Sequence, residues 1–445
     1  MAKILLIILD GLGDRPAPGL EGKTPLEAAY TPNMDALAKV GINGLYSVFA
    51  PGVPVGSPIA LHTMFNYPGE DYPDRGVLIA VSRGFETNYE DVVLAARFAS
   101  VEPHNGQLKL RARFIKEAEE ACCALASAIA YYEKDGLRFR YQYWGRGDGI
   151  LYISGDASPD ISDSDPLGLD LPVIKIQPME NAREKDKASR TAEALNSYLS
   201  WAYREMSRHP VAEQRAKDEL YPINFLITKW SGRRTKLEPF KDKFGLMAVS
   251  MPAEEVVKGL AAEMGMAVLD TPNELEPEVD IKERLKRAEE LFSQGYEFIH
   301  LHTKEPDATS HWCDPCKTKE VIEALDRGFG YYWEHLGRDE DLVTVLTSDH
   351  TTPSAWEGFS PGDFNDQHSG EPVPLTIKGR HVRRDDVSSS GERPCSRGGL
   401  GHVRGAELME ILLSLADRTN LLGMRPTPRI RPYRPKQVEP FVPTS

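Results

Sequence analysis

Cysteine is scarce in this sequence, and long apolar runs are missing from it. Five cysteines are spread over 445 residues. So small and odd a number in a large chain argues against a disulfide framework and favours a reducing compartment, so we expect a cytoplasmic protein. The apolar run nearest the N-terminus, Ile4–Leu9, stops at Asp10. It is too short to span a membrane and lacks the cleavage pattern of a signal peptide, so we expect no membrane association.

Positive charge is also in deficit. Lysine and arginine number 53 against 67 aspartates and glutamates, which gives a formal net charge of −14. Nucleic-acid binding needs many basic contacts to phosphates, so this balance argues against a nucleic-acid partner. Hydrophobic residues at 41% and aromatic residues at 9% are nevertheless sufficient for packed cores. A chain of this length predicts two or three folding units.

Apolar strand-like runs alternate with helical segments in the first 75 residues and again after residue 220. That alternation is typical of an α/β fold in which a mostly parallel sheet is sandwiched by helices. Residues 76–220 have a different texture, which predicts an inserted α+β domain. The core is therefore expected at 1–75 and 221–423. Residues 424–445 are rich in proline and arginine and predict an extended C-terminal arm.

Four polar segments that follow predicted strands carry the chemistry. Asp10 follows the opening strand, and Ser57 lies in a Gly-Ser-Pro turn before a helix. The other candidates are Asp307 and His311 in HTKEPDATSH, Asp349 and His350 in TSDH, and His368 in DQHSGEPVP. Ligands bind at the carboxyl edge of open α/β sheets, so we expect these side chains to converge there.

Three carboxylates, three imidazoles and one hydroxyl form a donor set that suits divalent metal ions. Oxygen ligands suit hard ions, and imidazole adds zinc, manganese or iron. Two ions can bind the attacking and leaving oxygens of a phosphoryl transfer. An ion beside Ser57 would also favour loss of the proton from the Ser57 hydroxyl, which gives the more nucleophilic alkoxide. Taken singly, Asp-Gly is usually a turn, and Asp-x-x-x-His is often a surface pair or a helix cap. Their coincidence at successive strand ends favours a metal site.

Ten motifs follow one another in an order that matches a known family: DGLGDRP, TPLEAAYTPNMDALAKVG, PGVPVGS, RFASVE, ISDSDPLG, RTAEALN, HTKEPDATSH, TSDHTTP, HSGEPVP and LGHVRGAELMEILL. In this order they resemble the archaeal-type, 2,3-bisphosphoglycerate-independent phosphoglycerate mutases of the alkaline phosphatase superfamily. The resemblance covers residues 3–423. It implies an alkaline-phosphatase-like fold and the interconversion of 2- and 3-phosphoglycerate.

The resemblance also implies roles for individual residues. Asp10, Ser57, Asp349 and His350 would hold one divalent ion, and Asp307, His311 and His368 would hold the other. The ions would be Mn²⁺, Zn²⁺, Co²⁺ or Mg²⁺, with no requirement for 2,3-bisphosphoglycerate. Ser57 would be the nucleophile that becomes phosphorylated, and Lys304 would stabilise the phosphoryl group in transfer. The inserted domain would close over a small phosphorylated carboxylate.

Several positions depart from the family pattern, and they concern substrate binding. The substituted positions are Pro58, Leu61, Gly147, Asp148, Ser154 and Leu167. Asp148 in place of an arginine would repel an anion, although Arg146 could compensate. Arg75 is a candidate contact for phosphate or carboxylate, with an interdomain salt bridge as its other interpretation.

Two questions stay open at the level of the sequence. The altered positions allow a paralogue that acts as a transferase or hydrolase on another phospho- or phosphono-carboxylate, for example in phosphonate biosynthesis. The oligomeric state is not decided.

Overall fold

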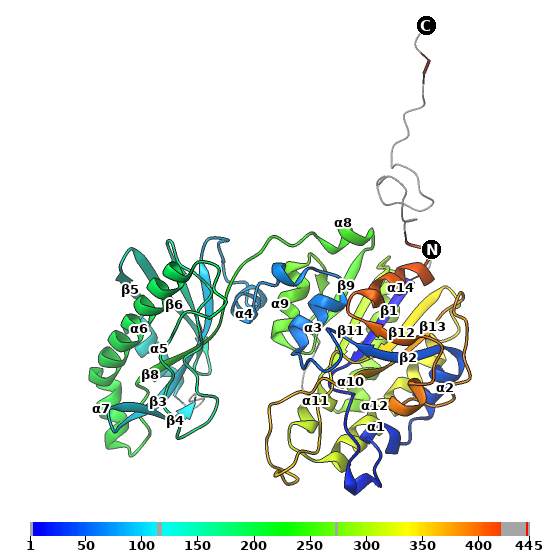
Figure 1. The fold of residues 1–445 in the computed structure, drawn as a ribbon, viewed down its shortest axis with the longest axis horizontal. Helices are drawn as coiled ribbons and strands as arrows, with labels where there is room; N and C mark the ends of the chain where they lie inside the picture. Colours follow the sequence, from blue (N-terminus) through cyan, green and yellow to red (C-terminus); the bar gives the residue numbers. More distant parts are fainter. Residues whose placement is uncertain (1–2, 114–117, 272–274, 420–441, 444–445) are drawn as a thin grey trace. The chain divides into compact units, whose positions relative to one another are not determined.

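The computed structural model describes residues 3–113, 118–271, 275–419 and 442–443. The chain divides into two compact units: unit 1 is Met1–Tyr72 with Leu237–Ser445, and unit 2 is Pro73–Lys236. Figure 1 draws both units. Apart from residues 442–443, the arm predicted at 424–445 lies outside the described residues. No helix among the described residues is both long and apolar enough to cross a membrane.

An eight-stranded sheet forms the centre of unit 1. Its order is β10-β9-β11-β1-β12-β13-β2-β14. The strands are β1 (Lys3–Leu9), β2 (Ile42–Ser47), β9 (Ala248–Met251), β10 (Ala267–Val268), β11 (Phe298–Thr303), β12 (Leu342–Thr347), β13 (Val373–Lys378) and β14 (Gly401–Arg404). Neighbours from β10 through β12 are parallel, whereas β13 is antiparallel to both β12 and β2. The predicted mostly parallel sheet is confirmed.

Helices cover both faces of this sheet. They are α1 (Pro25–Ala28), α2 (Pro32–Val40), α3 (Ser57–Met64), α8 (Phe240–Phe244), α9 (Glu255–Glu263), α10 (Pro277–Ser293), α11 (Glu305–Ser310), α12 (Pro315–His335), α13 (Glu392–Cys395) and α14 (Glu407–Leu415), with short 3-10 helices at Pro18–Leu20 and Gly69–Asp71. Leu5 and Ile7 of β1 share a core with α10 and α12. On the opposite face, the ring of Phe65 contacts Phe298 and His300 of β11. With both faces covered, β1 is a continuous apolar run.

Unit 2 is built on an antiparallel sheet in the order β4-β3-β7-β6-β5, with β8 also paired to β3. Its strands are β3 (Val92–His104), β4 (Gln107–Arg113), β5 (Tyr131–Lys134), β6 (Leu137–Gly145), β7 (Asp148–Ser154) and β8 (Phe225–Arg233). Its helices are α4 (Arg75–Ser82), α5 (Glu119–Ala128), α6 (Lys185–Arg208) and α7 (Pro210–Lys217). The α+β character expected for the inserted segment is what the structure has.

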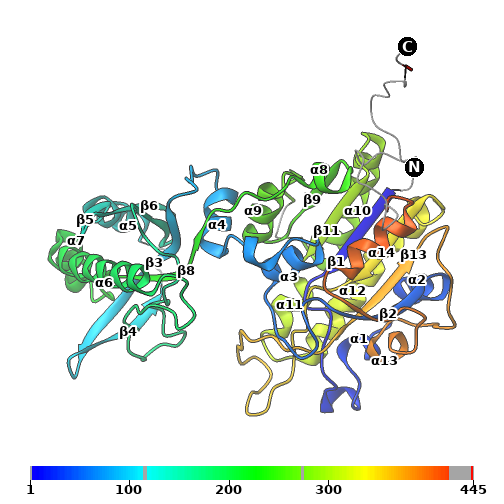
Figure 2. The ribbon, with the colours of Figure 1, turned by 45° about the horizontal axis from the view of Figure 1, so that its top comes forward.

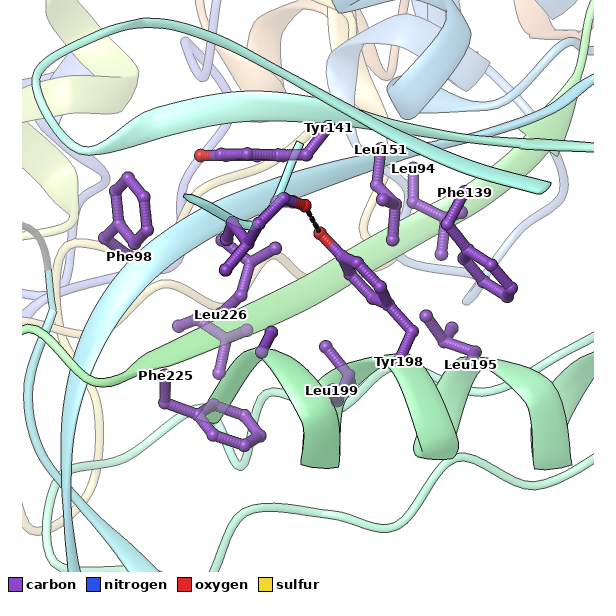
Figure 3. Packing of buried hydrophobic residues seen from close by; sticks show 14 of the residues in the cluster. Leu94, Phe98, Phe139, Tyr141, Leu151, Leu195, Tyr198, Leu199, Phe225 and Leu226 are labelled. Carbon is purple, nitrogen blue, oxygen red and sulfur yellow. Dashed lines mark hydrogen bonds between the residues drawn. The ribbon is translucent and has the colours of Figure 1, made fainter. Parts of the chain in front are cut away.

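Helix α6 packs its apolar face on this sheet. Leu195, Tyr198 and Leu199 recur at helical spacing and point into the core that Figure 3 shows. The Tyr198 ring stacks on Phe139 with centroids 5.2 Å apart, and its hydroxyl donates to the carbonyl of Ile129 at 3.1 Å. This hydrogen bond satisfies the polar group that Tyr198 carries into the core.

The borders of the two units differ from those predicted from the sequence. The apolar run in β8 was assigned to the parallel sheet, but Phe225, Leu226 and Ile227 pair antiparallel with β3. Unit 2 therefore runs from residue 73 to residue 236 instead of 76 to 220. An apolar run shows that a strand is buried but does not show which sheet receives it, because both sheets accept the same residue types.

A carboxyl group in α13 makes the stability of unit 1 depend on pH. Glu392 accepts hydrogen bonds from the hydroxyl of Thr24 (2.7 Å) and the amide of Asp14 (3.2 Å). Burial nevertheless raises its pKa to about 7. The folded state therefore binds a proton that the unfolded chain releases near pH 4.5, so Glu392 contributes stability at low pH that is lost as pH rises to 7. The loss is about 3 kcal/mol.

We expect Glu392→Gln to reduce this pH dependence. Urea unfolding midpoints, measured at pH 5 and pH 8, should fall with pH in the parent protein and fall less in the variant. The comparison is made within each protein, so a uniform loss of stability in the variant does not affect it. Equal falls in the two proteins would contradict the assignment.

Candidate metal centre

Parallel strands deliver the candidate ligands to one edge of the unit 1 sheet. The strands β11 and β1 lie side by side (Figure 2). On its other edge β1 pairs with β12, and Ile8 of β1 is level with Thr347 of β12. Asp10 comes one residue after the end of β1, and Asp349 comes two residues after the end of β12. Asp307 lies beyond the end of β11, in the first turn of α11. The amide of Asp307 donates to the carbonyl of Asp10 at 3.0 Å. The sheet register thus brings together side chains that are hundreds of residues apart.

Gly11 allows this close approach of two chain segments. Its φ is +67°, and a Cβ at this position would lie 2.6 Å from Cα of Asp307. Both the backbone conformation and the lack of space require glycine.

We expect Gly11→Ala to force Asp10 and Asp307 apart and to weaken Mn²⁺ binding by about tenfold or more. Isothermal titration of the metal-stripped protein would measure this. Gly19→Ala is the matched control, since a Cβ there meets nothing within 4 Å. Unchanged Mn²⁺ affinity in Gly11→Ala would show that the approach is not needed.

The first cluster of ligand atoms consists of Asp10, Asp349 and His350, all buried. His350 Nε2 lies 3.1 Å from Asp10 Oδ1 and 3.5 Å from Asp349 Oδ2. Ser57 Oγ lies 3.3 Å from Asp10 Oδ2 and 3.2 Å from His350 Nε2. Asp10 Oδ1 and Asp349 Oδ2 receive no hydrogen bond from any described residue. Buried carboxylate oxygens without donors are costly, so this donor set fits a divalent cation.

The second cluster is centred on Asp307. His311 Nε2 lies 3.2 Å from Asp307 Oδ2, and His368 Nε2 lies 3.5 Å from Asp307 Oδ1. His311 Nδ1 bonds the carbonyl of Asn365 at 2.5 Å, and His368 Nδ1 bonds that of Val55 at 2.7 Å. A carbonyl only accepts, so Nδ1 of each ring carries a proton, and Nε2 is the nitrogen that faces the aspartate. Both imidazoles are therefore oriented with Nε2 as the atom that would bind a metal ion after it loses its proton.

The two clusters share His350. Its ligand atom groups with those of Asp307 and His368 as well as with those of Asp10 and Asp349. The rings of His350 and His368 stack with centroids 3.8 Å apart. The structure therefore brings together all seven predicted ligand residues, and His350 lies between the two sets into which the family resemblance divides them.

The side chains of the centre carry surplus negative charge. Burial alone would lower the pKa of His350, but Asp349 and Asp10 outweigh it and raise that pKa to about 9. Burial also opposes the charge on Lys304, yet Asp10, Asp307 and Glu254 raise its pKa above the ordinary value. Cations are thus stabilised throughout the centre, which is what a site for divalent ions requires.

Three residues of the centre were not predicted from the sequence. Thr352 Oγ1 lies 2.6 Å from Asp307 Oδ1 and 3.1 Å from His350 Nδ1. The fully buried His302 places Nε2 3.4 Å from Asp10 Oδ2. Glu254 Oε1 lies 2.6 Å from Lys304 Nζ. Thr352 and His302 stand inside the quoted motifs and could have been noticed, whereas Glu254 has no signal in the sequence.

The candidate substrate residues Arg75 and Arg146 belong to unit 2. The guanidinium of Arg75 lies over the ring of Trp230, 4.9 Å from its centroid. Arg146 has a φ of +56° in the turn between β6 and β7. Asp148 is held by Arg97, with Nε and Nη2 at 2.5 and 2.8 Å from its two carboxylate oxygens. The negative charge of Asp148 is therefore neutralised within unit 2.

The substitutions beside Ser57 are accommodated by α3. Pro58 falls in its first turn, where proline is tolerated because the N–H has no helical partner. Leu61 is fully buried. His62, the nearest imidazole in sequence, packs against the rings of Tyr67 and Tyr72 and has no hydrogen-bond partner among the described residues. None of its described contacts is with the metal centre.

This fold and site define a metal-dependent enzyme: a mostly parallel α/β sheet with two overlapping carboxylate and imidazole clusters at its carboxyl edge. The family model described as the Metalloenzyme superfamily matches residues 2–415.

Known proteins specify the family further. The chain is 36% identical to the 2,3-bisphosphoglycerate-independent phosphoglycerate mutase 2 of Methanocaldococcus jannaschii, over 98% of each chain. It is also 36% identical to the corresponding mutase of Thermococcus kodakarensis, over 95% of this chain and 99% of that one. The chain belongs to the family of 2,3-bisphosphoglycerate-independent phosphoglycerate mutases, as the motifs predicted.

Solved structures agree with this assignment. The PH0037 protein from Pyrococcus horikoshii matches with a TM-score of 0.75 at 32% identity, over 95% of this chain and 99% of that one. The cofactor-independent phosphoglycerate mutase from Thermoplasma acidophilum matches with a TM-score of 0.62 at 28% identity, over 94% and 100%.

Proposed function

We propose that this enzyme interconverts 2-phosphoglycerate and 3-phosphoglycerate through a phosphoserine at Ser57. The observation that carries the proposal is the position of the Ser57 hydroxyl. Its Oγ lies within 3.3 Å of one candidate metal ligand, Asp10, and within 3.2 Å of a second, His350, at the start of α3. A hydroxyl placed between ligands of a divalent cation is suited to act as a nucleophile.

Two divalent ions, Mn²⁺, Zn²⁺, Co²⁺ or Mg²⁺, belong to this proposal, and 2,3-bisphosphoglycerate does not. Asp10, Ser57, Asp349 and His350 would hold one ion, and Asp307, His311 and His368 would hold the other. Bound there, the ions would lower the pKa of the Ser57 hydroxyl and offset the charge of the phosphoryl oxygens.

The side chains of the centre perform two transfers in sequence. The Ser57 hydroxyl loses its proton and its Oγ forms a bond to phosphorus, while the ester P–O bond breaks and the glycerate oxygen takes up one proton, so no net proton is released. Lys304 stabilises the charge on the oxygens of the transferred group. Glycerate then turns, and its other hydroxyl loses its proton and forms a bond to phosphorus, while the Oγ–P bond breaks and Ser57 Oγ takes up one proton. The site must exclude water between the two transfers, or the phosphoserine is hydrolysed.

Holding glycerate requires groups that bind its carboxylate and phosphate. We assign this role to unit 2, with Arg75 and Arg146 as the proposed contacts. A cytoplasmic location is part of the same proposal, supported by five cysteines that are all free.

The proposal is tested by giving the Mn²⁺-loaded protein 3-phosphoglycerate and following the products by phosphorus NMR. Accumulation of 2-phosphoglycerate is the expected result. Release of inorganic phosphate alone would mean that water takes the phosphoryl group. No turnover by protein that retains Mn²⁺ would overturn the substrate and favour another phospho- or phosphono-carboxylate.

A further inference from the structure

Lys304 shares its ammonium among three carboxylates, and one of them lies outside the candidate ligand set. Nζ is 2.8 Å from Asp10 Oδ2, 2.6 Å from Asp307 Oδ2 and 2.6 Å from Glu254 Oε1. Asp10 and Asp307 belong to different ligand clusters, so a single side-chain cation bridges both. A divalent ion at either position draws on the same carboxylate charge as the ammonium does.

We infer that Glu254 is a positioning residue, which retains Lys304 beside the metal centre when the ions occupy Asp10 and Asp307. Without Glu254, the ammonium has only the two ligand carboxylates as described partners and competes with the ions for them. The inference rests on the proposed function, in which Lys304 stabilises the phosphoryl group.

The register of the sheet places Glu254 next to Lys304. Strands β9 and β11 are parallel neighbours, and Met251 is level with Leu301. Glu254 and Lys304 each lie three residues beyond that pair. Both segments therefore bring a charged side chain to the carboxyl edge of the sheet. Parallel register therefore accounts for the ion pair, although the two residues are 50 positions apart in the sequence.

The segment that leads into Glu254 is held by two hydrogen bonds. The carbonyl of Met251 accepts a hydrogen bond from Nη1 of the buried Arg284 at 2.9 Å. The amide of Ala253 donates to Nδ1 of the buried His302 at 3.3 Å. These contacts hold the carboxylate at a defined place before any ligand binds, which is the property that a positioning residue needs.

Glu254 also has an unused oxygen with which to hold the ammonium. Its Oε2 is buried and has no hydrogen-bond partner among the described residues. An unpaired buried acceptor is unfavourable, so a donor that arrives there is stabilised. When Asp10 and Asp307 turn to the ions, Lys304 can replace the two lost contacts with a second contact to Glu254.

A double-mutant cycle tests the inference. The full-length protein is stripped of metal, and the Kd for Mn²⁺ is measured for the parent, Glu254→Gln, Lys304→Met and the double variant. We expect Glu254→Gln to weaken Mn²⁺ binding by about tenfold. In the Lys304→Met background the same change should alter Kd by less than about twofold, because the competing ammonium is gone.

Two further variants separate position from charge. Glu254→Asp should recover part of the Mn²⁺ affinity. Glu305→Gln removes a neighbouring carboxylate that accepts from the backbone amide of Lys304 (3.1 Å), and it should leave Kd unchanged. Equal weakening by Glu254→Gln in both Lys304 backgrounds would overturn the inference, as would no weakening at all. Absence of mutase activity together with an intact cycle would count against the proposed function alone, since Mn²⁺ binding is read without substrate.

Discussion

Replacing Ser57 with alanine is expected to abolish phosphoryl transfer, with kcat lower by a factor of about 10⁴ or more. The change removes the one oxygen that the proposed mechanism requires to form a bond to phosphorus. The carboxylates of Asp10 and Asp349 and the ring of His350 remain, so Mn²⁺ should still bind, and loss of activity then reports on the nucleophile. Phosphorus NMR with 3-phosphoglycerate measures the rate.

The covalent step has its own readout. Parent protein quenched in acid during turnover should yield a Ser57-containing peptide that carries phosphate, detected by mass spectrometry, and Ser57→Ala should yield none. Thr63→Ala is the matched control, because the Thr63 hydroxyl lies on the same helix but donates to the carbonyl of Ile59 at 2.9 Å. Full activity in Ser57→Ala would exclude the phosphoserine mechanism.

Replacing Asp10 with asparagine is expected to remove most of the metal affinity, by about 100-fold or more. Asp10 is fully buried and contacts Ser57, His350 and Lys304. It is also one cause, after burial, of the raised pKa of Asp349. Although burial and the charge of Asp307 oppose ionisation, Lys304 and His350 hold the pKa of the Asp10 carboxyl well below its usual range. Asp10→Asn removes this favourable charge, so the variant stripped of metal should be less stable than the stripped parent.

Thermal unfolding with and without Mn²⁺ separates these two effects. A ligand that binds only the folded state stabilises it, and the rise in Tm grows with the logarithm of the ratio of ligand concentration to Kd. The parent Tm should therefore rise with Mn²⁺, and the Tm of Asp10→Asn should change little. Asp386→Asn, which alters an exposed carboxylate of unit 1, should behave like the parent. A parent-like rise in Asp10→Asn would show that Asp10 is not a ligand.

Much of the metal centre could be predicted from local patterns. Asp10 and Asp349 follow buried strands directly, and Asp307 and His311 are four residues apart on one helical turn, so their common location follows from the geometry of a parallel sheet. Lys304 was recognised because it lies within the same motif. Glu254 was missed because its partner, Lys304, lies on a different strand, and no local pattern marks one of several glutamates in that region.

The fold class, the family and the set of residues that converge on the metal centre could all be read from the sequence. Those properties depend on hydrophobic period and on short motifs, which are local. Tertiary structure alone decided that β8 joins the antiparallel sheet, that Arg97 neutralises Asp148, and that His350 stands between both ligand clusters. Each of these is a pairing between distant segments. Such pairings are selected by packing and by strand register, and the identity of either partner does not specify them.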